Sequence, residues 1–296
     1  MCLALRVLSL CQSSLRRYGE SLESIQEAVD IGRKLVSRNA TEFDPILARL
    51  LRRYGAALTA LCQNDEALRV VEEGVQIYRR LLVKDARKFE PELASSLFCM
   101  AHDLRRCMYR QQAIMVASEG VSIRRRLAER DPAAFEPSLA SSFRDYATLL
   151  AEKGQFTDAI WYGQKSVDIY RQLAISDSSR FDHKLAQALH NLGSMLGECG
   201  RDGDAVRPVK EAIALRRFTS AEDSDPELQA DLAASLLLYA SVLVKLGKDE
   251  ALGVAHESVE ILKRMVITDP ARFEGELELS LEQVERLCLV SRTHDD

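Results

Sequence analysis

The hydrophobic positions of this chain recur at an interval of 46 residues. Aligning the sequence with itself at that shift places apolar residues in one column: Val29, Val75, Val121, Val167, Ile213 and Val259. Two residues further on, a second column contains Ile31, Ile77, Ile123, Ile169, Leu215 and Ile261. Periods of roughly 20–50 residues are typical of repeat proteins, whose units bury their apolar faces against one another. The pattern therefore predicts a stack of six similar units.

Each unit is predicted to form two helices. Between Pro45 and Cys62 the apolar residues recur at steps of three and four, which is the period of an amphipathic helix. A short turn follows, and Asp65 is the predicted N-cap of a second helix that continues through Leu81. No part of the sequence alternates with a period of two, so we expect no strands. The predicted fold is an all-α, right-handed solenoid of antiparallel helix pairs.

The connection between units carries three recurring residue types. An Asx residue, expected to start a tight turn, occupies the column Asn39, Asp85, Asp131, Asp177, Asp223 and Asp269. Four residues later comes a phenylalanine that should fill the gap between successive units: Phe43, Phe89, Phe135, Phe181 and Phe273. The prolines Pro45, Pro91 and Pro137 are expected at the first position of the next helix, where a missing N–H is harmless. The acidic residues before this position (Asp44, Glu90, Glu136 and Asp182) should favour the positive helix end.

These columns predict a single repeat domain over residues 1–296. The expected units are 1–44, 45–90, 91–136, 137–182, 183–226 and 227–274, followed by a capping helix at 275–290 and a polar tail at 291–296. An acidic loop at 219–226 replaces the Phe connector, and we interpret it as drift in a tolerant loop. Small residues recur where the two helices should cross closely, as in the column Ser9, Gly55, Ala101, Ala147, Gly193 and Ala240.

The second unit resembles the tetratricopeptide repeat (TPR). It contains Tyr54-Gly55 between leucines, then a turn, then Asp65-Glu66-Ala67 and a small residue seven positions later. Leu-Ala-x-Ser at 93–96 and 139–142, with Glu-x-Val-x-Ile at 119–123, is similar to the long-unit arrays of kinesin-light-chain type in fungi and bacteria. The period is longer than the roughly 34 residues of the usual repeat, and the proline after the second helix is absent. The resemblance implies a helical interaction scaffold.

Composition and motifs limit the class of function. The formal net charge of -5 disfavours a nucleic-acid-binding protein. The sequence contains no run of 18 apolar residues, so we expect no membrane span. The seven cysteines form no CxxC pair, so we expect reduced thiols in a cytoplasmic protein. The sequence contains neither a P-loop nor a nucleophile–histidine motif. We therefore expect no enzyme activity, no cofactor and no metal site.

The first helix of each pair is expected to line the concave side of the solenoid. The predicted partner-binding residues on that face are Arg49, Arg52, Phe98, His102, Arg105, Arg106, Arg144 and His190. Arginine pairs bidentately with carboxylates, which favours an acidic peptide or protein partner. An ordinary solvated charged face is the alternative interpretation of the same residues.

Two functional hypotheses follow. The first is a non-enzymatic scaffold that binds a protein segment along its groove. The second is the regulatory or sensor part of a larger signalling or effector protein, since such arrays often adjoin a nucleotide-binding domain (STAND NTPase type) or a protease domain (CHAT type). It is motivated by the first unit, which has no capping segment and could pack on a neighbouring domain or on a second copy of the chain. RNA binding is disfavoured by the acidic charge and the few aromatic residues.

Overall fold

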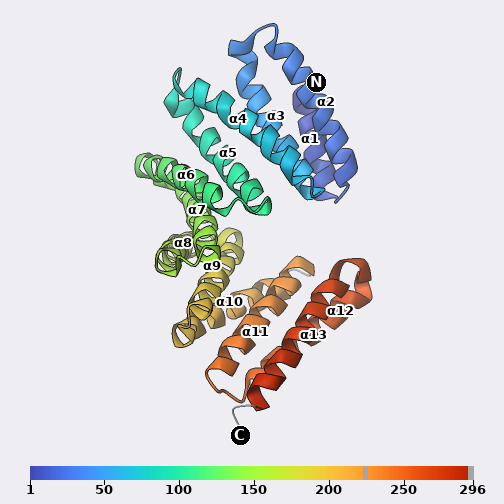
Figure 1. The fold of residues 1–296 in the computed structure, drawn as a ribbon, viewed down its shortest axis with the longest axis vertical. Coiled ribbons are helices and arrows are strands. Elements are labelled where there is room, and N and C mark those ends of the chain that lie inside the picture. Colours follow the sequence, from blue (N-terminus) through green and yellow to red (C-terminus); the bar gives the residue numbers. More distant parts are fainter. Residues whose placement is uncertain (223–225, 293–296) are drawn as a thin grey trace. The chain divides into compact units, whose positions relative to one another are not determined.

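The computed structural model describes residues 1–222 and 226–292, and these ranges contain thirteen α-helices and no strand (Figure 1). Helices fall into two compact units, Met1–Lys153 and Gly154–Asp296. Asp223 and the rest of segment 223–225 in the predicted acidic loop lie outside the described residues, as does the predicted tail from residue 293 onward. The all-α class expected from the sequence is confirmed.

Unit 1 contains α1 (Cys2–Ser14), α2 (Tyr18–Val36), α3 (Ala40–Ala60), α4 (Asn64–Leu82), α5 (Ala86–Arg106), α6 (Arg110–Arg130) and α7 (Pro132–Glu152). Unit 2 contains α8 (Phe156–Ser176), α9 (Ser178–Glu198), α10 (Asp202–Glu222), α11 (Pro226–Lys245), α12 (Ala251–Thr268) and α13 (Pro270–Arg292). Within each unit, every helix packs on the next helix along the chain, as the ribbon shows from the blue α1 to the green α7 (Figure 1). The odd-numbered helices of unit 1 are the first helices of the predicted pairs.

The first helices begin earlier than the sequence pattern predicts. Helix α3 starts at Ala40, so Pro45 lies inside it, and not at its first position. The reason is the Asn39 side chain, which accepts a hydrogen bond from the backbone N–H of Glu42 at 3.3 Å and so caps the helix. The same N-cap bond is made in three later repeats, by Asp85, Asp131 and Asp177. The predicted Asx turn is therefore the helix start itself, and Pro91 and Pro137 are internal as well.

The predicted start of α4 also needs correction. The helix begins at Asn64 and its N-cap residue is Gln63, which makes no capping side-chain bond. Asp65 is therefore not the cap but lies within the first turn. An acidic residue in that turn still favours the helix, because the helix N-terminus carries partial positive charge.

Two of the recurring phenylalanines, Phe89 and Phe181, pack between successive repeats, as expected. Phe89 of α5 is 7% exposed, and its ring centroid lies 6.5 Å from that of Tyr78 in α4. In unit 2, Phe181 of α9 and Tyr170 of α8 repeat this arrangement with the same centroid separation of 6.5 Å. Because the phenylalanine begins one repeat and the tyrosine ends the previous one, each pair joins two consecutive units of the array.

Small residues permit close helix crossings at two equivalent places. A Cβ atom at Gly55 would lie 2.2 Å from Cγ2 of Val71, and a Cβ atom at Gly193 would lie 2.3 Å from Cγ2 of Val209. Both distances are far below van der Waals contact, so glycine is required while the valine occupies its present position. The crossing predicted from the small-residue column is therefore present in both units.

Glu90 has a different role from the one its sequence position suggests. Its carboxylate accepts hydrogen bonds from Arg126 at 2.9 Å and Arg130 at 2.8 Å, both near the end of α6, and Glu90 lies inside α5 and not before its first residue. Burial alone raises the pKa of Glu90, but the two arginine hydrogen bonds outweigh this and leave the pKa below its ordinary value of 4.5. Glu90 therefore ties the beginning of α5 to the end of α6.

Replacing Glu90 with glutamine should destabilise the chain at pH 7 by about 1–3 kcal/mol, because a buried, charge-assisted contact is lost. A carboxylate with a depressed folded pKa stabilises above its unfolded pKa, and this contribution disappears as the pH falls through the folded value. The difference between wild type and Glu90→Gln in urea unfolding should therefore shrink well below pH 4.5. The exposed Arg87→Gln is the control, and a difference of similar size at pH 7 and pH 3 would contradict the ion-pair account.

One helix among the described residues, α11, is long and apolar enough to cross a membrane by length and composition. However, 56% of its apolar window is buried inside the protein, where α11 packs against α10 and α12. Burial of that kind is typical of a core helix in a repeat array.

Candidate functional site

Three of the first helices of unit 1 line an open pocket of about 480 Å³. We call it the unit-1 hollow. Helices α3, α5 and α7 all contribute to its lining, and α6 adds one arginine. The charged and aromatic side chains of the lining are Arg52, Phe98, His102, Asp103, Arg124 and Asp145. The hollow therefore lies on the face that the sequence predicts for partner binding, and it carries charges of both signs.

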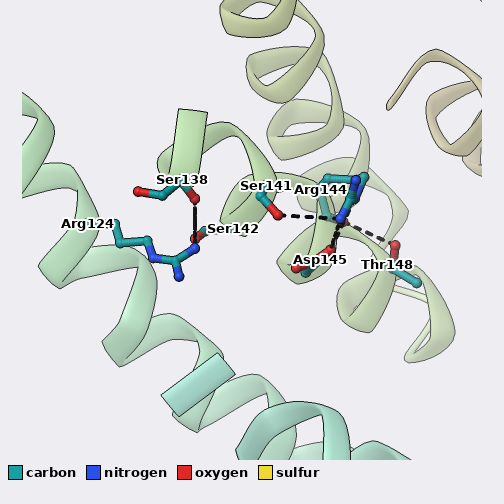
Figure 2. Close-up of polar contacts among 7 residues, drawn as sticks. All are labelled: Arg124, Ser138, Ser141, Ser142, Arg144, Asp145 and Thr148. Carbon is teal, nitrogen blue, oxygen red and sulfur yellow. Dashed lines mark hydrogen bonds and ion pairs between the residues drawn. The ribbon is translucent and has the colours of Figure 1, made fainter. Parts of the chain in front are cut away.

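One wall of the hollow is held together by Arg124. This arginine of α6 reaches across to α7, where it donates hydrogen bonds to the Ser138 carbonyl oxygen at 2.7 Å and to the Ser142 hydroxyl (Figure 2). Its guanidinium carbon lies 4.8 Å from the Phe98 ring centroid. Gly120 leaves room for that ring, because a Cβ atom there would come within 2.7 Å of it. Phe98 thus supports the wall from α5.

Arg52, which lines the hollow, is linked to two residues that do not line it, Glu92 and, through Glu92, Arg49. Arg49 and Arg52 of α3 share the single carboxylate of Glu92, at 3.3 Å and 3.6 Å. The Arg52 Nε atom is buried and has no hydrogen-bond partner. Since one carboxylate cannot fully balance two guanidinium groups, the pair of Arg49 and Arg52 retains a positive charge that suits an acidic ligand group.

A buried carboxylate lies beside the exposed histidine of the hollow. Asp103 is 3% exposed and accepts a hydrogen bond from the Thr59 hydroxyl at 2.8 Å, which links α5 to α3. His102 Nδ1 lies 3.7 Å from the same carboxylate, while half of the His102 side chain is exposed. Burial raises the pKa of the neighbouring Cys99 thiol against the opposing charge of Arg52, so this cysteine is a poor nucleophile.

The other predicted residues of unit 1 lie next to the hollow or outside it. Arg144 donates to Asp145 at 2.9 Å and to Ser141 at 3.4 Å, and both of these acceptors line the hollow (Figure 2). Arg105 forms an ion pair with Glu152 at 2.7 Å. Arg106 donates to the Asn64 side chain at 2.8 Å. Neither Arg105 nor Arg106 lines the hollow.

His190, the predicted site residue of unit 2, is held in an internal polar cluster. Its Nδ1 atom lies 3.0 Å from the Ser235 hydroxyl and 3.5 Å from the Arg216 guanidinium. Arg216 is 4% exposed and also donates to the Asp231 carbonyl oxygen at 2.5 Å. Burial, with a further contribution from the Arg216 charge, lowers the pKa of His190 to about 4. His190 is therefore neutral at physiological pH.

The sequence prediction missed Arg124 and Asp103, because it considered basic residues on first helices only. A signal for Arg124 is nevertheless present in the sequence. In four successive repeats, one position of the first helix and the position 26 residues later combine an arginine with an aromatic residue or a histidine: Arg52 and Tyr78, Phe98 and Arg124, Arg144 and Tyr170, His190 and Arg216. The order alternates, so every second arginine comes from the second helix.

Comparisons with known proteins agree with this architecture. A sequence model of the tetratricopeptide repeat matches residues 185–217. The crystal structure of BtubC (BKLC) from P. vanneervenii is similar with a TM-score of 0.67 and 17% identity, over 84% of this chain and 92% of that one. A putative kinesin light chain of Podosopora anserina with TPR-like repeats gives a TM-score of 0.56 and 18% identity, over 73% and 95%.

A third similar structure is a Rap protein complexed with competence and sporulation factor, with a TM-score of 0.57 and 13% identity over 96% of this chain and 75% of that chain. No curated protein matches the sequence of this chain. The chain thus contains a tetratricopeptide repeat and has the fold of a TPR-like solenoid.

Proposed function

We propose that this array of tetratricopeptide-like repeats is a non-enzymatic scaffold that binds a segment of a protein partner in the unit-1 hollow. The observation that carries the proposal is the hollow itself, where three first helices present charged side chains around one open pocket. Extended helical-repeat surfaces of this type commonly bind peptides. The similar Rap protein in complex with a factor supports a binding role for the fold. The described cysteines are free thiols, which suits the cytoplasm.

The chemistry of the hollow favours a segment with at least one acidic side chain. Arg49 and Arg52 share Glu92, so a ligand carboxylate can pair with the guanidinium group that faces the hollow. Asp103 and Asp145 also line this pocket. A segment that carries a basic residue near its acidic residue would match both the Arg52 guanidinium and these carboxylates.

This proposal can be tested by selecting peptides of about 12 residues from a displayed random library, with the full chain as the immobilised target. Calorimetry then measures the affinity of the selected peptides. The charge reversal Arg52→Glu should weaken the selected peptides at least about tenfold, equivalent to about 1.4 kcal/mol. Arg105→Glu is a matched control, because Arg105 is also an arginine of a first helix but lies outside the hollow. Circular dichroism should show unchanged helix content in both variants.

Failure to select any peptide would contradict the proposed function. So would selected peptides whose affinity is equally reduced by Arg52→Glu and Arg105→Glu, since this would indicate a general effect of charge. Enrichment of acidic peptides over a basic pool is the further expected result, and its absence would contradict the assigned role of Arg52.

A further inference from the structure

Three buried polar atoms in α3, α4 and α5 have no hydrogen-bond partner among the described residues. They are Arg52 Nε, the Tyr78 hydroxyl and the Ser96 hydroxyl, and we call them the Arg52 cluster. Tyr78 is 1% exposed and Ser96 is 0% exposed. Buried polar atoms without a partner are rare in proteins, because each one has lost its water without gaining another bond. Three of them in one part of the array indicate a partner group that the chain itself does not supply.

The next repeat shows that these three residues belong to one polar layer of the array. One period later, their equivalents are Phe98, Arg124 and Ser142. There the Arg124 guanidinium lies 4.8 Å from the Phe98 ring centroid and donates a hydrogen bond to the Ser142 hydroxyl (Figure 2). In the earlier repeat the arginine is on the first helix and the tyrosine on the second, and no guanidinium donates to Ser96. The later layer is thus completed by its own arginine, whereas the earlier layer is incomplete.

Arg52 connects this layer to the unit-1 hollow. It lines the hollow, whereas the other two residues of the cluster do not. Arg52 is also loosely held, because its ion pair with Glu92 is 3.6 Å long, compared with 2.7 Å between Arg79 and Glu119. About a third of the Arg52 side chain is exposed. A long side chain with so little restraint can turn toward the hollow and open a path to the two hydroxyls.

The cluster offers hydrogen-bond donors and lacks an acceptor. Burial and the Glu92 charge raise the pKa of Tyr78 to about 12 against the Arg52 and Arg49 charges, so the phenol is protonated at physiological pH. Arg49 lies near that hydroxyl but outside hydrogen-bonding geometry. Two hydroxyl protons and the Nε–H of Arg52 are therefore available together. A carboxylate accepts several such bonds at once, because it has two oxygens and a negative charge.

We propose that the Arg52 cluster is the subsite for the acidic side chain of a protein segment bound in the unit-1 hollow. This inference rests on the function proposed above and identifies the residues that recognise the acidic group. The ligand carboxylate replaces Glu92 beside Arg52 and accepts hydrogen bonds from Arg52 Nε and from the two hydroxyls. Glutamate fits this position better than aspartate, because its side chain is one methylene group longer and the hydroxyls lie below the surface.

The test measures, by calorimetry, the affinity of a selected acidic peptide for variants of the full chain. Tyr78→Phe and Ser96→Ala each remove one hydroxyl and should weaken binding at least about fivefold. Tyr170→Phe and Ser258→Ala are the matched controls, because both residues are buried in unit 2, and they should keep the affinity of the wild type. Glu92→Gln should tighten binding about two- to fivefold, since the ligand carboxylate no longer competes with Glu92 for Arg52.

The stability of the free chain distinguishes this subsite from a permanently bound water molecule. Without a ligand the two hydroxyls have no partner, so Tyr78→Phe and Ser96→Ala should not lower the midpoint of urea unfolding. Ser258→Ala should lower it, because the Ser258 hydroxyl donates a hydrogen bond to the Ala233 carbonyl oxygen at 2.8 Å. A lower midpoint in both Tyr78→Phe and Ser96→Ala would show that water already satisfies the cluster, and would overturn the proposal.

The peptide data separate this inference from the proposed function. Peptides that are weakened by Arg52→Glu, but bind Tyr78→Phe and Ser96→Ala as tightly as the wild type, would refute the subsite and leave the proposed function intact. If the selection yields no peptide at all, both are refuted. Circular dichroism checks that each variant keeps the helix content of the wild type.

Discussion

Replacing Gly55 with alanine is expected to lower the free energy of unfolding by about 1–3 kcal/mol, because the added methyl group overpacks the crossing of α3 and α4. The new Cβ atom would lie 2.2 Å from Cγ2 of Val71, a branched side chain that cannot simply swing away. In an ordinary exposed helix the same change stabilises by up to about 1 kcal/mol, so the sign of the effect is itself informative. Urea unfolding followed by circular dichroism measures it.

The chain offers both a rescue and a control for this variant. In the next repeat, Ala101 and Ala117 occupy the positions of Gly55 and Val71. The double variant Gly55→Ala/Val71→Ala should therefore show favourable coupling of about 1–3 kcal/mol relative to the sum of the single changes. Gly253→Ala in α12 is the control, because a Cβ atom there meets nothing within 4 Å. Equal effects of Gly55→Ala and Gly253→Ala would refute the close crossing.

Acidification from pH 6.5 to pH 4 should destabilise the chain by roughly 3 kcal/mol through His190 alone. The folded state holds the pKa of His190 at about 4, against 6.5 for an unperturbed histidine, because of burial and the Arg216 charge. Between these values the unfolded chain binds a proton that the folded chain does not, so stability is lost as the pH falls. Urea unfolding at pH 7.5, 5.5 and 4.5 measures this dependence of the free energy of unfolding on pH.

The phenylalanine of an earlier repeat provides the comparison for His190. Phe98 stands at the equivalent position and lies under Arg124 as His190 lies beside Arg216. His190→Phe should be less stable at pH 7.5, since Ser235 and Arg216 lose a partner. It should lack the loss of stability on acidification that is due to His190. His102→Gln, which alters a half-exposed histidine, should keep the pH dependence of the wild type. A His190→Phe chain as sensitive to acid as the wild type would rule out this assignment.

The spacing of apolar residues was sufficient to predict the helix pairs and the packing of Phe89 and Phe181. It misplaced the helix starts, because proline at the first helical position is the commoner arrangement and Pro45 resembled it. The N-cap bond from Asn39 decides the start instead, and whether an Asx side chain caps a helix or begins a turn depends on the backbone angles. Sequence type alone does not supply those angles.

The candidate site was predicted only in part for a related reason. Arg52, Phe98 and His102, which the repeat register assigns to one face, all line the unit-1 hollow. It could not show that Arg105 turns to Glu152, nor that Arg124 reaches in from α6. A long arginine side chain can extend to several partners, and its choice depends on which groups lie within a few ångströms after the helices pack.

The sequence by itself determined the period, the number and amphipathic faces of most helices, and the close crossing at Gly55, because these follow from residue spacing along one helix. Tertiary structure decided which charges pair and that His190 is neutral. Those features depend on contacts between residues that lie about one repeat apart in the sequence, as Arg49 and Glu92 do. Packing of successive helices creates them, and local spacing does not encode their geometry.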